Sequence, residues 1–575
     1  MSETPGTLAS RAVHQYRRRD IIAYVTLRQF LRNSATLQDI WSDQVAVDLV
    51  AERPQSHHNV VQNFKEIDES NGTPQFRILH VPGPTEMMAE TALLAACARA
   101  GGAFKCPSNV YSYRLSEDPK ESTGSFQYYF EGFKARHDAI AAACRANPEA
   151  LVVYTDIRQY YPSITPERAL QVWGMACKES GLSDRYEKLG EKLLRAAEAE
   201  HGHILTGPMI SHLIGNLALR ELDDDMAQQL PNGYFRYVDD IAIVTSKKQA
   251  LAVEQRIEEL LKRLGLEFNA KKRIEVPADR WLLGAEDFER EEQEKISWMT
   301  FIGDMKRLLV FYPEERKVLE SSFRVLGIRI RPLDYSDVAQ ERDFLENIKH
   351  YLEEGWFRRS VRAKKWAAGV IDQAVALRIR YKTELDELLT DFEQLDGFDK
   401  KRRLYRLRFL IGRLAYLGLS QDLPEISNAI SGIPEMAMAS AVLDAITTRN
   451  INQILKYGPS AAQAAAQPLR AGGIETTFTE ARWHEPEVIQ AYAVLRLNGL
   501  KIEGNSSPPD DPLIRFCDWG ENSVALFDHP NGYFREIGCI HGVDDPAANH
   551  WAIETAFDRD DAMVFDMQEI MQILS

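Results

Sequence analysis

Two adjacent carboxylates, Asp239 and Asp240, lie in the middle of the apolar and aromatic stretch 233–244. The residues on either side predict two short strands, with the acidic pair where the chain must turn. Neighbouring carboxylates repel each other and lose hydration, so they are stable together only where a cation lies nearby. Alone, the pair fits either a solvated turn, where Asp is common, or a divalent-metal site for phosphoryl chemistry.

A further carboxylate, Asp156, follows the apolar run 150–154, which is typical of a buried strand. A two-metal site needs acidic ligands from separate elements, because the ions stand about 3.5–4 Å apart along the line of phosphoryl displacement. One Asp at a strand end and two on a neighbouring hairpin would supply such a set. The sequence therefore favours the metal site, with Asp156, Asp239 and Asp240 as candidate catalytic residues.

Several short motifs lie around these carboxylates between residues 75 and 305, and both their residues and their order along the chain are informative. Together they resemble the reverse transcriptases. The segments that carry the resemblance are Asp156-Ile-Arg-Gln-Tyr-Tyr161, Gly207-Pro-Met-Ile-Ser211 with Asn216, Tyr237-Val-Asp-Asp240, Gly265-Leu-Glu-Phe-Asn269-Ala-Lys-Lys272 and Phe301-Ile-Gly303. At the position where many members have Gln before the loop glycine, this chain has Thr206, a departure that puts ordinary template handling in doubt.

The resemblance implies a DNA polymerase that uses dNTPs and Mg²⁺ or Mn²⁺, with DNA as its product. Asp156 and Asp239 would be the principal metal ligands, Asp240 a ligand or a supporting residue, and the carbonyl of Ile157 a further ligand. Tyr161 would exclude a ribose 2′-hydroxyl, whereas its neighbour Tyr160 is expected to fill the core. The other expected nucleotide contacts are Arg77, Arg114, Gly207, Ser211 and Lys272, and the expected nucleic-acid contacts in this part are Tyr237 and Gly303.

Some of these residues have ordinary alternatives. Arg77 and Arg114 suit phosphate because guanidinium forms a fork of donors, but either is equally compatible with a solvated surface arginine. Lys272 is placed by motif spacing near the leaving group, and a surface lysine is the alternative.

The predicted fold class is α+β, with a right-hand fingers–palm core followed by a mostly α-helical, repeat-like region. We expect a helical extension over 1–75, fingers and palm over 76–310, a helical domain replacing a thumb over 311–470, and a mixed region over 471–575. Residues 298–303 are expected to be a short strand and residues 523–540 a hairpin.

The helical half contains two runs of basic and aromatic residues. Such runs suit phosphate contacts combined with base stacking, although a solvated helix face is their usual meaning. The expected nucleic-acid contacts there are Arg358, Arg359, Lys364, Lys365, Arg402 and Arg406.

Charge and composition limit the kind of nucleic-acid contact and the cellular compartment that can be expected. The net charge of −16 excludes a uniformly basic coat but allows a basic channel. The cysteines form no CxxC pair, and no apolar run suits a signal or a membrane span, so a reduced, cytoplasmic protein without membrane contact is expected.

A fingers–palm core with a long helical C-terminus is similar to the bacterial abortive-infection and defence-associated reverse transcriptases. That narrower resemblance implies antiphage defence, RNA as template or structural partner, and a homo-oligomer. Synthesis would be untemplated, protein-primed or templated. The alternatives are a retron-like enzyme that copies a dedicated non-coding RNA and a non-catalytic RNA-binding scaffold.

Overall fold

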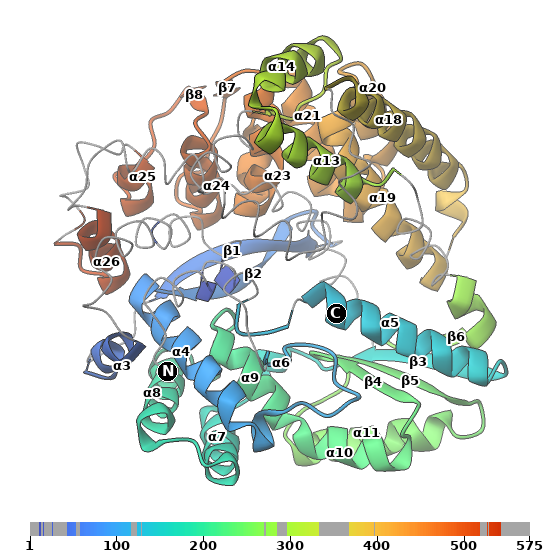
Figure 1. Cartoon of the computed structure of the whole chain (residues 1–575), viewed down its shortest axis with the longest axis vertical. Helices are drawn as coiled ribbons and strands as arrows, with labels where there is room; N and C mark the ends of the chain where they lie inside the picture. The colour runs from blue at the N-terminus through green and yellow to red at the C-terminus, as the bar shows by residue number, and fades with distance from the viewer. Residues whose placement is uncertain are drawn as a thin grey trace.

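The computed structural model describes residues 11–12, 15–16, 26, 43–52, 58–68, 70–116, 124–127, 129–269, 272–283, 296–332, 367–395, 397–517, 526 and 528–541. The fold is mixed α+β. Figure 1 shows a sheet with flanking helices below, and an arc of helices above.

The central sheet is antiparallel and has the strand order β4-β5-β3-β6. Its strands are β3 (Ala150–Asp156), β4 (Tyr234–Tyr237), β5 (Asp240–Ser246) and β6 (Ile274–Pro277). Successive side chains of each strand point to opposite faces of the sheet, and both faces are apolar. In β5, Ile241 and Ile243 join one core, whereas Ala242 and Val244 join the core beneath α5.

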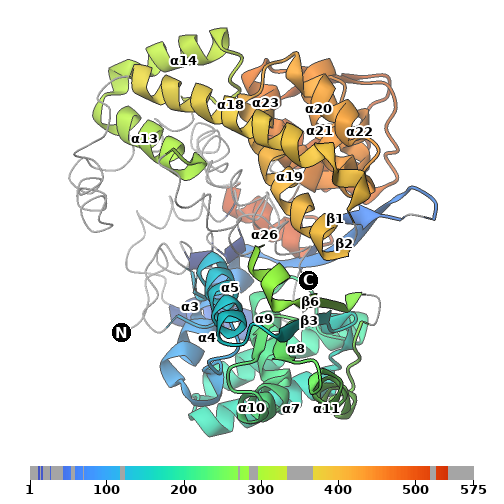
Figure 2. The same cartoon turned by 90° about the vertical axis from the view of Figure 1, so that its right-hand side faces the viewer.

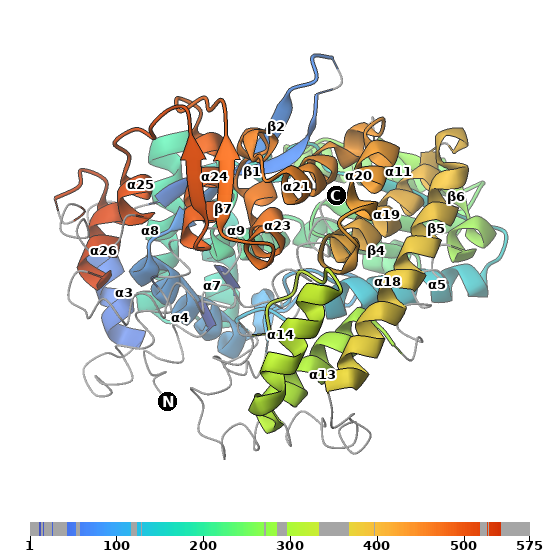
Figure 3. The ribbon, with the colours of Figure 1, turned by 90° about the horizontal axis from the view of Figure 1, so that it is seen from above.

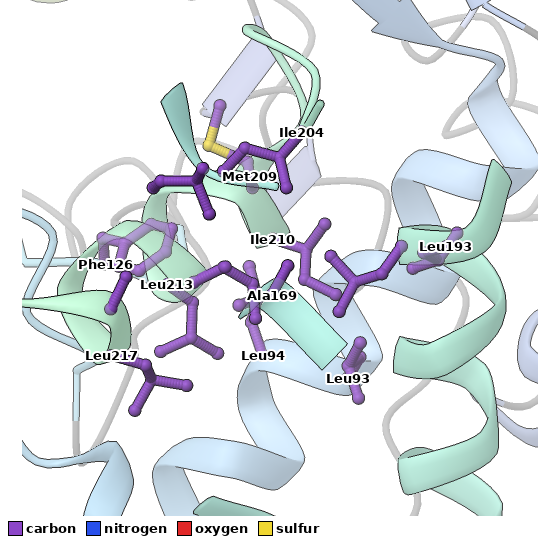
Figure 4. Close-up of a cluster of buried hydrophobic side chains, with 14 of the residues drawn as sticks. Leu93, Leu94, Phe126, Ala169, Leu193, Ile204, Met209, Ile210, Leu213 and Leu217 are labelled. Carbon is purple, nitrogen blue, oxygen red and sulfur yellow. The ribbon is translucent and has the colours of Figure 1, made fainter. Parts of the chain in front are cut away.

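Helices cover both faces of this sheet. The helices of this half are α3 (Asp43–Glu52), α4 (Pro84–Ala100), α5 (Tyr129–Ala146), α6 (Tyr160–Ser163), α7 (Pro166–Ser180), α8 (Asp184–His201), α9 (Met209–Ala218), α10 (Arg220–Gln229) and α11 (Ala250–Arg263). The most enclosed is α9, whose residues are all buried. Figure 4 shows its apolar side chains beside Leu93 and Leu94 of α4 and Ala169 of α7. This packing fixes the segment that follows Gly207.

The C-terminal half is built from successive helices around a second core. They are α13 (Trp298–Phe311), α14 (Arg316–Val325), α18 (Ala367–Thr390), α19 (Gly397–Leu417), α20 (Asp422–Ile430), α21 (Ala437–Thr448), α22 (Asn452–Lys456), α23 (Gly458–Ala471) and α24 (Pro486–Leu497). A parallel pair, β7 (Glu475–Phe478) and β8 (Lys501–Gly504), then α25 (Pro512–Cys517) and α26 (Gly532–His541), complete it. Figure 3 shows β7 and β8 beside α24.

A hairpin of β1 (His58–Ile67) and β2 (Pro74–Pro82) lies between the two halves (Figure 2). It is tied to the helical half by side chain–backbone bonds: Gln490 accepts from the Gln62 amide (2.8 Å) and donates to the Val60 carbonyl (2.7 Å). Within the segment expected to be helical, His58–Ile67 is therefore a strand, and the expectation is wrong there.

Two further secondary-structure predictions are wrong. Residues 298–303 open helix α13, which Ser297 caps by accepting from the Thr300 amide. The apolar positions 298, 301, 302, 305 and 308 follow the helical period, which a six-residue window was too short to reveal. Likewise, much of the stretch 523–540 is helix α26 rather than a hairpin. Within the described part of the chain, no helix combines the length and apolar character needed to cross a bilayer.

Candidate active site

The carboxylates singled out by the sequence lie at the same end of the two central strands of the sheet. Asp156, the last residue of β3, lies directly opposite Asp240, the first residue of β5. Residues paired in this way project their side chains to the same face of a sheet. Asp239 occupies the turn before β5, and its carbonyl accepts from the Ile157 amide (3.2 Å). The predicted strand end and hairpin are confirmed.

The turn that carries the acidic pair is held in place by hydrogen bonds to the residue before the pair. Val238 adopts a positive φ of 56°, an uncommon conformation for a β-branched residue. Its amide donates to the Ser112 hydroxyl (2.6 Å), and its carbonyl accepts from Arg236 (2.7 Å). The surrounding structure therefore imposes this backbone conformation.

Arg236 is the centre of this support and is fully buried. It forms a bidentate ion pair with Asp223 of α10, at 2.6 and 2.8 Å, and neither side chain is exposed. It also donates to the Asn216 side-chain oxygen (3.2 Å), and the Asn216 amide donates to the Ser112 carbonyl (3.1 Å). Asn216 of the nucleotide-loop motif thus positions the acidic hairpin.

Burial and mutual repulsion make the acidic pair easy to protonate. Burial, followed by the charge of Asp239, raises the pKa of Asp240 well above its ordinary value. Burial also raises the pKa of Asp239, while the nearby cations Arg77 and Lys272 act in the opposite direction. Carboxylates in such a setting are stabilised by added positive charge.

Lys272 supplies part of that charge. Its ammonium nitrogen lies 2.9 Å from Asp156 Oδ2, and the backbone beside it is anchored because the Asn269 amide donates to the Asp156 carbonyl (2.9 Å). The lysine named by the motif therefore reaches the carboxylate cluster.

The fit of this site to a divalent ion is incomplete as it stands. Asp156 Oδ1 is buried without a hydrogen-bond partner, and hard carboxylate oxygens are the donors that Mg²⁺ prefers. However, among the residues that the structure describes, no three acidic, histidine or cysteine side chains are grouped closely enough to hold an ion. Two carboxylates on paired strands and a third in the turn would need small side-chain adjustments to bind one.

The residues expected to contact the nucleotide lie on separate elements, with Tyr161 on α6, Ser211 on α9 and Arg77 on β2. The Tyr161 hydroxyl contacts His212 Nδ1, and the His212 ring stacks on Tyr113 with centroids 3.7 Å apart. Tyr160 is only 4% exposed and packs in the core, as predicted. Arg77, on β2, is close enough to Asp239 to influence its pKa.

The loop before α9 owes its shape to Gly207. This residue has a φ of 135°, and a Cβ there would stand 2.2 Å from the His80 carbonyl oxygen. The next turn is capped by buried Glu90, which accepts from the Ile210 amide (2.6 Å). Ser211 is buried on the same helix. Gly207 thus shapes the loop, and Ser211 lies in the first turn of the helix that follows it.

Arg114 turns toward its own loop. It donates to the carbonyls of Val110, Pro107 and Ser108, and its guanidinium lies over the Tyr111 ring. These contacts brace the loop that also holds the acidic turn.

The residues expected to contact nucleic acid are dispersed. Tyr237 is buried beneath α5, with its hydroxyl donating to the Tyr129 carbonyl (3.2 Å), so it presents no surface for such contact. Gly303 lies inside helix α13 and not on a primer-gripping strand. On α19, Arg406 is paired with Glu384 of α18, and Arg402 is half-buried. Arg358, Arg359, Lys364 and Lys365 lie outside the described residues.

Two cationic residues near the carboxylates were not singled out from the sequence. Arg136 of α5 is buried and donates to the Asp240 carbonyl (3.3 Å). Lys401 of α19 interacts electrostatically with Asp156 and Asp240. Lys401 belongs to one of the basic and aromatic runs that suggested phosphate contacts, whereas a basic residue on the buried face of a helix was the only sequence signal for Arg136.

Comparison with known proteins adds little to this geometry. No family model matches the chain, and no curated protein matches it. Solved structures of telomerase align over much of its length at low similarity. Apo telomerase from Candida tropicalis has 12% identity and a TM-score of 0.26, covering 64% of this chain and 71% of that one. Telomerase from Candida albicans with a TWJ fragment of telomeric RNA has 11% identity and a TM-score of 0.28, covering 68% and 64%. Scores this low leave fold and function to be argued from the chain itself.

Proposed function

We propose that the chain is a metal-dependent DNA polymerase of the reverse-transcriptase type, acting on dNTPs in antiphage defence. The observation that carries the proposal is the pairing of Asp156 with Asp240 across β3 and β5, with Asp239 in the adjoining turn and Lys272 against Asp156. The order of the sequence motifs supports the same chemistry. The defence role, and an untemplated or protein-primed mode, rest on the narrower resemblance alone.

In this proposal, Asp156, Asp239 and Asp240 would hold Mg²⁺ or Mn²⁺, with the Ile157 carbonyl beside them. When bound, the ions would lower the pKa of a primer 3′-hydroxyl and neutralise the charge of the triphosphate. The 3′-oxygen would then bond to the α-phosphorus as pyrophosphate leaves, and its proton would pass to solvent. Lys272 would move from Asp156 to the leaving pyrophosphate, because a lysine ammonium binds phosphate oxygens strongly.

Tyr161 would select the sugar. Its ring packs against the core and its hydroxyl contacts His212, so it cannot easily swing aside for a ribose 2′-hydroxyl. Gly215 leaves room for this arrangement, since a Cβ there would approach the rings of Tyr160 and Tyr161.

A second candidate is a non-catalytic scaffold that binds RNA. It is favoured by one observation: among the described residues, no three acidic, histidine or cysteine side chains are grouped closely enough to hold an ion.

Product analysis separates these functions. The purified protein, with whatever nucleic acid it retains, would be supplied with Mg²⁺ and labelled dNTPs, and any product sequenced. The polymerase proposal predicts labelled DNA. Product complementary to a co-purified RNA would indicate templated synthesis, and a random or single-base product would indicate untemplated synthesis. RNA retained with no DNA made, in Mg²⁺ or Mn²⁺, would support the scaffold and contradict the proposal.

A further inference from the structure

The first turns of α19 reach from the helical half to the edge of the central sheet (Figure 2). Phe398 packs with the core beneath α5, and Asp399 accepts from Arg280 Nε (3.1 Å). The ion pair and the apolar contact hold this end of the helix beside β6. The helical half is thereby attached next to edge strand β6, which pairs with the Asp156-bearing strand β3.

One face of α19 is turned toward those strands. Phe398, Lys401 and Tyr405 are spaced three and four residues apart and so lie along one side of the helix. Tyr405 is half-buried with its hydroxyl oxygen enclosed, it lies near Asp240 and Tyr154, and burial raises its pKa. Lys401, between the two, is half-buried, and its charge interacts with Asp156, Asp240 and Lys272.

The other basic residues of this helix have different partners. Arg406 pairs with Glu384, Arg403 donates to the Leu388 carbonyl (3.3 Å) and Arg408 to the Glu435 carbonyl (2.8 Å). In the described part of the chain, the Lys401 ammonium makes no hydrogen bond or close ion pair. Its three donors are therefore available to a ligand.

We propose that Lys401 is a substrate-binding residue whose ammonium group contacts the triphosphate of the incoming nucleotide. The inference rests on the proposed polymerase function. It follows from the charge of the loaded site, because two divalent ions would outweigh three carboxylates and repel any further cation. Lys272 and Lys401 would then be stable only beside another anion, and the triphosphate is the anion that the reaction brings.

Binding of dTTP tests this directly, with Ca²⁺ in place of Mg²⁺ so that the nucleotide is bound without being consumed. Lys401→Gln should raise the Kd for dTTP about tenfold, the scale of one charge-assisted hydrogen bond, and raise KM similarly. The value of kcat and the thermal midpoint should change little, and Lys401→Arg should restore most of the affinity. Lys382→Gln is the matched control, because Lys382 pairs with Asp386 on the surface of neighbouring α18.

An unchanged Kd in Lys401→Gln, in a protein that still incorporates dNTPs, would overturn the inference and leave the polymerase function intact. A loss of affinity that follows a lower thermal midpoint and is not rescued by Arg would assign Lys401 a structural role, and would also overturn it. If the wild-type protein neither binds dTTP nor incorporates dNTPs, the proposed function fails, and the inference fails with it.

Discussion

At the scale of single residues, the acidic hairpin depends on a charge pair that no solvent reaches. Asp223 and Arg236 are both fully buried, and Arg236 also fixes the carbonyl of Val238 immediately before the acidic pair. A buried pair adds little net stability compared with an apolar pair, but removing one partner leaves an isolated buried charge. The cost of breaking it is therefore large.

Asp223→Asn keeps the shape of the side chain and removes its charge. We expect it to lower the free energy of unfolding by about 3–5 kcal/mol, measured from the midpoint of urea denaturation. Glu179→Gln is the control, because the Glu179–Arg220 pair is exposed and such pairs contribute at most about 1 kcal/mol. Equal effects of the two changes would show that Arg236 does not depend on Asp223.

The sequence identified the acidic residues but not the residues that place them. Asp156, Asp239 and Asp240 were predictable because each stands at the end of an apolar run. Arg136 and Arg236 were not, because an arginine inside such a run gives no sign of which carboxylate or carbonyl it will face. Tyr237 was expected to contact nucleic acid, but it is buried beneath α5. Its burial depends on tertiary packing, which the local sequence does not show.

At the scale of elements, the loop before α9 depends on the absence of a side chain. Gly207 approaches the backbone of β2 at a positive φ, and the His80 amide donates to the Thr206 carbonyl (2.8 Å). This contact ties the predicted nucleotide loop to the strand that carries Arg77.

Gly207→Ala should therefore destabilise the protein by at least about 2 kcal/mol, from backbone strain and a clash with a carbonyl. Gly174→Ala should have the opposite sign, a gain of about 0.5–1 kcal/mol, because Gly174 lies inside helix α7 with no atom near its Cβ position. Urea midpoints of both variants provide the measurement. A neutral Gly207→Ala would mean that the loop does not pack on β2 as described.

Element prediction succeeded where an apolar run allowed one interpretation and failed where it allowed two. Strand β3 falls on the apolar run 150–154, and strands β4 and β5 fall on the stretch 233–244, as expected. The opening of α13 was mistaken for a strand because a short run of apolar and aromatic residues suits both states until several helical turns are counted.

At the scale of the whole molecule, the helical half contacts both sides of the site. Gln490 of this half is hydrogen-bonded to the β1–β2 hairpin. Asp399 pairs with Arg280, just after β6, and the charge of Lys401 interacts with the carboxylates of the sheet. Gln62 and Gln490 are separated by 428 positions in sequence. Contacts of this range leave no local pattern, so the sequence predicted the helices but not where they dock.

The most direct test of the account compares the rates at which the intact protein incorporates labelled dNTPs with Mg²⁺ present. We predict incorporation by the wild type, its loss on chelation with EDTA, and a reduction of about a thousandfold or more in Asp239→Asn. Asp138→Asn should match the wild type, because Asp138 is an exposed residue of α5. Equal rates for wild type and Asp239→Asn, or no incorporation by the wild type with either Mg²⁺ or Mn²⁺, would contradict the account.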